Sequence, residues 1–222
     1  MAQTTNQPKP RRRAPGRPAA DGADLRERLL DAAIACYVRQ GIAGASLRMI
    51  ATEAGTTPAL LHYYFGDKQQ LQEAVAQERV LPTLGIVIAE MTSAGDDIAA
   101  VIAAFVRGVG KAVASAPWLP PLWVREVLCE GGALRGLLVD TIVPKVPALL
   151  VQRLAQAQRK GGLNPDLDPR LLVVSLVGLT LFPAASAGIW KSVFGAHDVT
   201  PDMLHQHTIA LLDRGLELRD AK

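Results

Sequence analysis

The feature that most restricts the fold is a stretch in the first third of the chain where helix start and stop signals follow one another closely. Ser46 is a helix N-cap residue, and Gly55 ends the helix that follows it. Thr57 and Pro58 form an N-cap followed by proline at the first helical position. Helices this short are not stable alone in water. We therefore predict two short helices that pack against each other across a turn of about three residues.

Longer helices are predicted on both sides of this pair. Asp24 and Glu27 form a capping box, so a helix is expected to begin there and to end at Gly41. A second capping box, from Asp67 to Gln70, opens the next helix. The first eighty or so residues are thus expected to hold three compact helices followed by a longer one.

The remainder of the 222-residue chain is expected to be helical too. Half of the residues are hydrophobic (49%), alanine and leucine dominate, and no alternating strand pattern occurs. Two further N-cap and proline pairs, Asp168-Pro169 and Thr200-Pro201, mark helix starts. The predicted fold class is all-α, with a three-helix, homeodomain-like helix-turn-helix domain and a larger helical domain after it. The apolar runs of that larger part lie around 81–91, 98–113, 119–129, 134–154, 171–190 and 203–216.

The short pair has the residue types that a helix-turn-helix requires. Ala51 is small enough to let the second helix approach, Gly55 makes the turn, and Leu61 fills the interface. Short helical pairs with alanine and glycine at these places also occur in other helical proteins. The three residues alone are therefore compatible either with a helix-turn-helix or with an ordinary helical pair. Because Leu61 must face inward, the opposite face of its helix must be exposed. That face carries Thr57, Pro58, Ala59, His62 and Tyr63.

The exposed face suits contact with the major groove of DNA. Hydroxyl, imidazole and phenol groups can bond to phosphates and base edges, and the small Ala59 allows close approach. Lys68 adds a cation beside a helix N-terminus, where a phosphate is attracted. Ser46, Arg48 and Leu60 complete the predicted contacts in this domain.

The first twenty residues carry five cations, Lys9, Arg11, Arg12, Arg13 and Arg17, and no acid. The segment lacks the apolar region of a secretory signal, and its prolines exclude an amphipathic transit helix. It is either a solubilising tail or a basic arm in which Arg13 and Arg17 contact DNA. We expect it to be disordered, as residues 1–22.

The two cysteines and one apolar run bear on the compartment. Cys36 and Cys129 are too far apart and too few for a disulfide framework or a zinc site, so a reducing cytoplasm is expected. The uncharged run from Leu171 to Trp190 is long enough to span a membrane, but Gly178 and Pro183 interrupt it. A helix buried inside a protein or an oligomer has the same composition.

Residues 25–75, above all ASLRMIATEAGTTPALLHYYFGDKQQLQEAV, resemble the N-terminal domain of the tetracycline-repressor (TetR) family of bacterial transcription regulators. The shared positions are Ser46, Ile50-Ala51, Ala54-Gly55, Leu61, Tyr63-Tyr64-Phe65, Lys68 and Leu71. The family usually has an aromatic residue where His62 stands, so a phosphate contact there would be made by an imidazole and would depend on pH.

The resemblance implies a helix-turn-helix domain over residues 23–70 and an effector-binding, dimerising domain over 71–222. It further implies a homodimer, without cofactor, metal or membrane, that represses transcription from a pseudo-palindromic DNA operator and is released by a small-molecule effector. In this family the last two long helices pack against the same helices of the second subunit. Burial in such a dimer would explain the uncharged run at 171–190 without a membrane. The expected dimer residues are Leu176, Leu179, Phe182, Leu204, Thr208, Leu211 and Leu212.

The effector pocket is expected around the segment WLPPLWVREVLCEGG. Glu126 lies on an apolar helical face there, either at its wet edge or inside a pocket that holds a donor or cation. Phe105, Trp118 and Trp123 are candidate pocket walls, with ordinary core packing as the alternative. Cys129 completes the predicted site.

Two other classes of function compete with a regulator. A helical enzyme is disfavoured because no phosphate loop, GxSxG elbow or HExxH motif occurs. His205 and His207 are two apart on a predicted helix and point to different sides, so they cannot bind one metal ion there. An architectural DNA-binding protein without an effector would not need the large C-terminal region.

Overall fold

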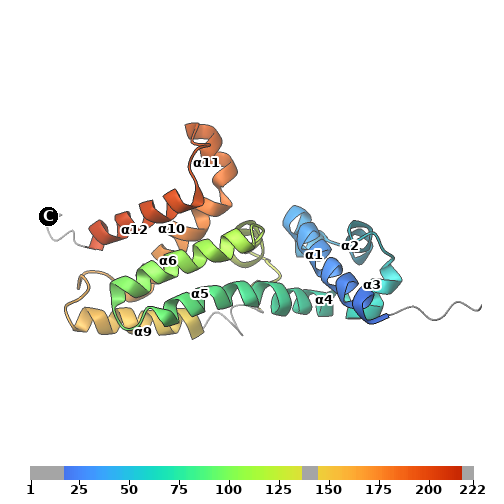
Figure 1. The fold of residues 1–222 in the computed structure, drawn as a ribbon, viewed down its shortest axis with the longest axis horizontal. Helices are drawn as coiled ribbons and strands as arrows, with labels where there is room; N and C mark the ends of the chain where they lie inside the picture. Colours follow the sequence, from blue (N-terminus) through green and yellow to red (C-terminus); the bar gives the residue numbers. More distant parts are fainter. Residues whose placement is uncertain (1–17, 137–144, 217–222) are drawn as a thin grey trace, which may run out of the picture.

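The computed structural model describes residues 18–136 and 145–216. The N-terminal domain consists of α1 (Pro18–Gly44), α2 (Leu47–Glu53) and α3 (Pro58–Phe65) (Figure 1). Helix α1 runs through the predicted capping box at Asp24 and begins several residues before it, inside the segment assigned to the basic arm. Its end agrees with the prediction, because Gly41 leaves the helical conformation at φ 77° and ψ 159°.

The predicted caps of the short helices are confirmed. Ser46 Oγ accepts the Met49 amide at 3.2 Å, and Thr57 Oγ1 accepts the Leu60 amide at 3.4 Å. Asp67 accepts the Gln70 amide at 2.8 Å. Each side chain satisfies one of the amides that a helix N-terminus leaves without a partner, which fixes where the helices begin.

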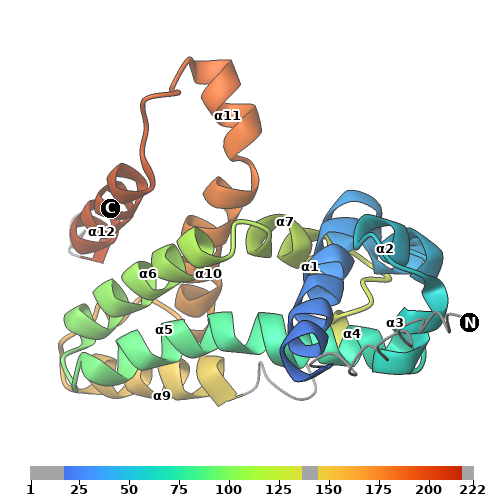
Figure 2. The same cartoon turned by 45° about the vertical axis from the view of Figure 1, so that its right-hand side comes forward.

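One continuous helical rod joins the N-terminal domain to the rest of the molecule. It consists of α4 (Lys68–Val75), a π-helical turn (Ala76–Val80) and α5 (Leu81–Ser93) (Figure 2). Pro82 explains the irregular turn, because it has no amide proton and its ring crowds the carbonyl four residues back, that of Glu78. That carbonyl accepts Arg79 Nη1 at 3.3 Å instead. The predicted domain boundary after residue 70 therefore lies within this rod.

The C-terminal body is built around α6 (Ile98–Ser115), which packs along α5. The other elements are α7 (Leu119–Trp123), a second π-helical turn (Val124–Leu128), α9 (Lys145–Arg159), α10 (Pro169–Ala185), α11 (Ala187–Phe194) and α12 (Pro201–Leu216). Helices α9, α10 and α12 also contact α6. Helix α11 stands away from this body (Figures 1 and 2).

Among the described residues, α6 is long and apolar enough to cross a membrane, and half of its residues are buried in the body. The apolar run at 171–190 divides into α10 and α11, which meet at an angle of 71° and together pass the same test. The bend lies close to Pro183, one of the residues expected to interrupt the run. Burial explains the apolar character of α6 without a bilayer.

The molecule has two hydrophobic cores, and the N-terminal core includes residues from the C-terminal part of the chain. Leu122, Val127 and Leu134 are buried against the side chains of α1 to α4. Trp118 packs against both cores. The N-terminal domain therefore does not have a core of its own.

The crossing of α5 and α6 depends on Gly108. A Cβ atom there would lie 2.9 Å from the Val87 Cα, which is backbone and cannot move aside. We expect Gly108→Ala to lower the free energy of unfolding by about 1 kcal/mol. Overpacking costs about 1–3 kcal/mol, whereas alanine stabilises the helix by only about 1 kcal/mol relative to glycine. Gly85→Ala on α5 is the matched control, since its added methyl group would meet no other part of the described structure within 4 Å beyond the adjoining backbone of its own helix, and it should stabilise. Urea denaturation measures both; stabilisation by both would contradict the close crossing.

Candidate nucleic-acid interface

The turn between α2 and α3 is fixed by its backbone. Gly55 has a φ of 67°, a conformation that favours glycine. Its amide donates to the Thr52 carbonyl at 3.1 Å, and the Thr56 amide donates to the Ala51 carbonyl at 2.8 Å. This pair of bonds is a Schellman motif, which ends α2 and turns the chain into α3.

Buried residues then set the orientation of α3. Ala51 and Leu61 are completely buried at the contact between the two helices. Tyr64 and Phe65 pack against the N-terminal core, as predicted. The same register turns the opposite side of α3 toward solvent.

The exposed side of α3 contains the residues that the sequence places there: Thr57, Pro58, Ala59, His62 and Tyr63. Tyr63 is the most prominent, with 80% of its surface exposed. Its ring stands edge-on to that of Tyr64 at a centroid distance of 5.4 Å, which limits how it can turn. Leu60 is half-buried beside them. The result is a polar and aromatic face on a rigid helix.

His62 is held by a local contact. Its Nδ1 contacts the Gly66 carbonyl, which can only accept a hydrogen bond. Nδ1 must therefore carry the proton, and Nε2 of the neutral ring can only accept. A hydrogen bond from Nε2 to a phosphate oxygen would need a proton on Nε2 as well.

Three further residues that are predicted to contact DNA lie around α3. Ser46 and Arg48 are exposed at the start of α2. Lys68 is half-buried, and its Nζ donates to the Ala43 carbonyl at 2.9 Å. Lys68 thus ties the start of α4 to the end of α1, and two of its three ammonium protons remain for other partners. Arg13 and Arg17 lie outside the described residues.

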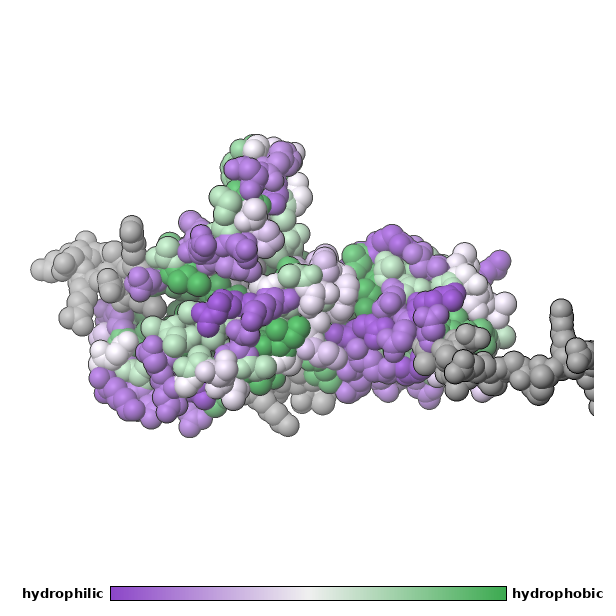
Figure 3. Space-filling model, in the orientation of Figure 1, coloured by the Kyte–Doolittle hydropathy of each residue, from purple (hydrophilic) through white to green (hydrophobic). Residues whose placement is uncertain are grey.

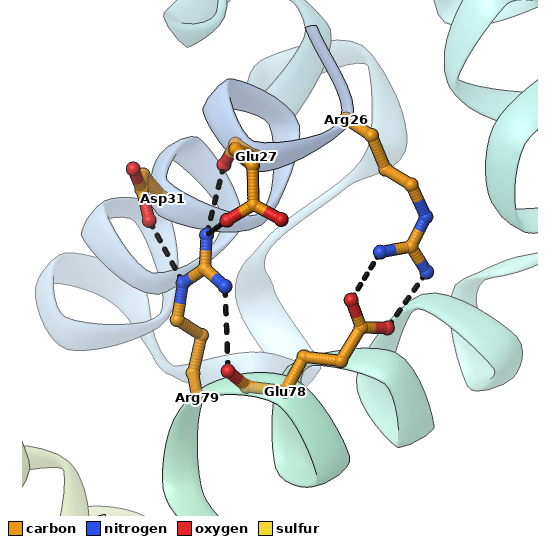
Figure 4. Close-up of polar contacts among 5 residues, drawn as sticks. All are labelled: Arg26, Glu27, Asp31, Glu78 and Arg79. Atoms are coloured by element: carbon orange, nitrogen blue, oxygen red, sulfur yellow. Dashed lines mark hydrogen bonds and ion pairs between the residues drawn. The ribbon is translucent and has the colours of Figure 1, made fainter. Parts of the chain in front are cut away.

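Ion pairs between α1 and the rod hold this domain in place (Figure 4). Arg26 forms a bidentate pair with Glu78, and Arg79 binds Glu27 Oε2 at 2.7 Å and Asp31 Oδ1 at 2.9 Å. The hydrogen bond from Arg26 lowers the pKa of Glu78. These residues were not predicted from the sequence. Their one local signal is that Glu27 and Asp31, four residues apart, share a helical face.

A second contact joins α1 to the C-terminal part at Gly41. Arg125 Nη1 donates to the Val38 and Arg39 carbonyls at 3.2 and 3.1 Å, at the end of the regular part of α1. Glu126 Oε1 accepts the Ile42 amide at 3.0 Å, just beyond the helix break. We refer to Arg125 and Glu126, bound to this end of α1, as the junction.

The effector candidates are dispersed. Glu126 is 4% exposed, and its second carboxylate oxygen accepts the Ala133 amide at 3.1 Å, so both oxygens are bonded to backbone. Glu126 is therefore not at a wet edge, which was one predicted place; it is buried beside donors, as the other alternative required, and those donors are backbone amides. Phe105 lies in the C-terminal core, and Cys129 is exposed. The indole nitrogen of Trp123 is buried and has no partner among the described residues. Trp118, between the cores, completes the set.

The predicted dimer residues divide into two groups. Leu176, Thr208 and Leu212 are buried within one chain, so they do not lie on an outer surface. Leu179 and Leu204 are half-buried, whereas Phe182 and Leu211 are exposed. The physical reason is helical phase: the outer side of α10 carries Leu171, Val174 and Phe182, and Leu176 points inward from it.

A short helix packed through a tight turn, with an exposed polar and aromatic face, has the arrangement of a helix-turn-helix. Residues 29–75 match the family model described as bacterial regulatory proteins, tetR family. The match shows that this domain is similar to that of bacterial tetR-family regulators.

Relatives of known name match the same region. The regulator SrpR of Pseudomonas putida is 36% identical over 64 residues, which cover 29% of this chain and 30% of SrpR. The nicotine-responsive repressor HdnoR of Paenarthrobacter nicotinovorans is 38% identical over 78 residues, 35% of this chain and 40% of HdnoR. The chain thus spans well under half the length of both relatives.

Solved structures extend the likeness to the whole fold. The fatty acid degradation regulator FadR of Bacillus halodurans has a TM-score of 0.65 at 22% identity, covering 88% of this chain and 96% of FadR. A TetR-like regulator from Rhodococcus sp. RHA1 has a TM-score of 0.61 at 21% identity, covering 93% of this chain and all of the other. At this identity the likeness concerns the fold.

Proposed function

We propose that the protein is a ligand-responsive transcription regulator that acts as a repressor in the cytoplasm, without enzymatic turnover. It binds a pseudo-palindromic operator as a homodimer, with one α3 in each of two successive major grooves. The observation that carries the proposal is the exposed face of α3 on a rigid helix-turn-helix, within the segment that matches the tetR family model. HdnoR and SCO4008 of Streptomyces coelicolor, both repressors by name, support the direction of regulation.

Contacts with DNA are assigned to the exposed residues around α3. Thr57, Tyr63 and His62 bond to phosphates or base edges, and Ala59 permits close approach. Ser46, Arg48, Leu60 and Lys68 flank them. Arg13 and Arg17 would add contacts from the basic arm.

A small-molecule effector releases the complex by favouring a different arrangement of the two α3 helices. To weaken binding a hundredfold, it must distinguish the two states by about 2.7 kcal/mol. The structure of FadR from Bacillus subtilis in complex with stearoyl-CoA supports an effector site in this fold. Phe105, Trp118 and Trp123 remain our candidates for the wall of that site, and Cys129 for its rim.

The proposal is tested by binding to DNA from the region upstream of the protein's own gene. Fluorescence anisotropy across a salt series compares this duplex with a scrambled one of equal length. We expect strong preference for the native sequence, with two protomers bound, because base contacts add to the salt-dependent phosphate contacts. Equal binding of both duplexes, lost steeply with salt, or tight binding by a monomer would contradict it. An effector screen on the complex then tests release.

A further inference from the structure

A pocket lies at the base of α11, the helix that protrudes from the body in Figure 3. It has a volume of about 280 Å³ and is formed where α6, α10, α11 and α12 meet. Ligand pockets in proteins usually measure about 300–1,000 Å³, so this one suits a molecule smaller than a typical drug. The effector candidates named above do not line it, so it is a separate pocket.

The walls of the pocket are apolar and rigid. Trp190 Nε1 donates a hydrogen bond to the Pro183 carbonyl at 2.9 Å, which fixes the plane of the indole ring. The side chains of Pro117, Pro183 and Pro201 contribute three further rigid rings. An aromatic ring packed against an indole gains more than the area it buries would give. These walls therefore favour a flat ring over a flexible chain.

A cation lies beside the indole ring. Lys191 Nζ is 5.7 Å from the centroid of the Trp190 ring and donates to the Val199 carbonyl at 2.6 Å. All three residues line the pocket. The bond to Val199 uses one of the three ammonium protons, so two remain for a ligand. A molecule packed on the indole would thus have its polar substituent within reach of the ammonium group.

An imidazole is the second polar group that can bind a ligand here. His205 packs over Gly110 of α6, where any side-chain methyl group would overlap its ring. The residue is half-buried, and no hydrogen bond to another described residue occupies its ring nitrogens. A neutral imidazole always has one nitrogen that can donate. Within the described part of the chain no carboxylate lines the pocket, and the neighbouring Asp198 and Asp202 are exposed.

We propose that this pocket is a binding site for a small aromatic carboxylic acid. The ring of the ligand packs against Trp190, and its carboxylate oxygens accept hydrogen bonds from Lys191 and His205. Hydrogen bonds between ionised groups are stronger than those between neutral groups, so the ligand binds as the anion. The inference goes beyond the proposed function, because it assigns a second ligand site and does not depend on binding to DNA.

The test is isothermal titration calorimetry of the full-length protein, without DNA, with cinnamate and its neutral counterpart cinnamamide. We expect saturable binding of cinnamate, at least tenfold tighter than that of the amide, because only the acid pairs with the ammonium group. Octanoate, an aliphatic acid of similar size, should bind more weakly than cinnamate, because it has no ring to pack on Trp190.

Two variants test the donors. Lys191→Met and His205→Leu should each weaken cinnamate at least tenfold, since each removes a hydrogen bond to a charged group. Lys160→Met and His197→Leu are the matched controls, because both residues are exposed and lie outside the pocket. Circular dichroism should show the same helical content in all four variants.

Each failure has a distinct meaning. Absence of saturable cinnamate binding at millimolar concentration would overturn the site, and a pocket filled by the second subunit of a dimer would give this result. Cinnamate binding that neither variant weakens, or that cinnamamide or octanoate equals, would overturn the assigned ligand class. These results would leave the proposed DNA-binding regulator intact, since the titration contains no DNA. Conversely, a protein without preference for the native duplex would still be expected to bind cinnamate.

Discussion

Replacing Glu126 with alanine is expected to lower the free energy of unfolding by about 2–4 kcal/mol. The carboxylate accepts the Ile42 amide from α1 and the Ala133 amide from its own segment, and Glu126 is almost completely buried. Its removal leaves two backbone donors without an acceptor, and each such buried donor costs about 1–3 kcal/mol. Denaturation in urea, with fluorescence and circular dichroism as probes, measures the loss.

Glu126→Gln refines this prediction, because the amide keeps one acceptor oxygen and turns a donor toward the other backbone amide. We expect it to lose less stability than the alanine variant. Glu130→Ala is the matched control, since Glu130 is exposed four residues further on. A loss below about 1 kcal/mol for Glu126→Ala, within the ordinary range of a surface substitution, would mean that water replaces the carboxylate and that the junction is not stabilised by it.

Removing the hydroxyl of Tyr63 is expected to weaken operator binding about 30-fold. Tyr63→Phe keeps the ring and its edge contact with Tyr64. It deletes the hydrogen bond to DNA that we propose for the hydroxyl group. Such a bond contributes about 1 kcal/mol, and a dimer loses two of them, about 2 kcal/mol in total. Tyr63→Ala should weaken binding further, since it also removes the apolar contact surface of the ring.

The measurement is fluorescence anisotropy with the operator duplex at one fixed salt concentration. Tyr64→Phe provides the control, because the neighbouring ring is turned toward the N-terminal core and should not contact DNA. Thermal unfolding should be unchanged in Tyr63→Phe, whose side chain is 80% exposed. Operator affinity of Tyr63→Ala within twofold of the wild type would place the DNA on another face of the domain.

Much of the N-terminal domain could be predicted because its signals are local. Ser46, Thr57 and Asp67 bond to amides within three residues, so the sequence alone locates the starts of α2, α3 and α4. The exposed face of α3 follows from the single requirement that Leu61 points inward. Local signals can also give a wrong prediction. The capping box at Asp24 lies inside α1 and marks neither the start nor the end of that helix.

Contacts between distant segments could not be predicted in the same way. Arg79 meets Glu27 and Asp31 only after the rod has folded back along α1. Glu126 was noticed as a carboxylate on an apolar face, but the donors that satisfy it belong to backbone amides, which have no signature in the sequence. On the outer side of α10 only Phe182 is predicted from the sequence, because a wholly apolar helix does not reveal which of its sides faces inward.

The shared N-terminal core has a consequence for building hybrid regulators. Leu122, Val127 and Leu134 fill space among the helices of the DNA-binding domain, although they follow it by some fifty residues in the chain. A chimaera that joins this domain to a foreign sensor after the rod would leave a void where those side chains belong. Transplanting operator specificity therefore requires moving the segment from α7 to Leu134 together with the domain, or replacing only the exposed residues of α3.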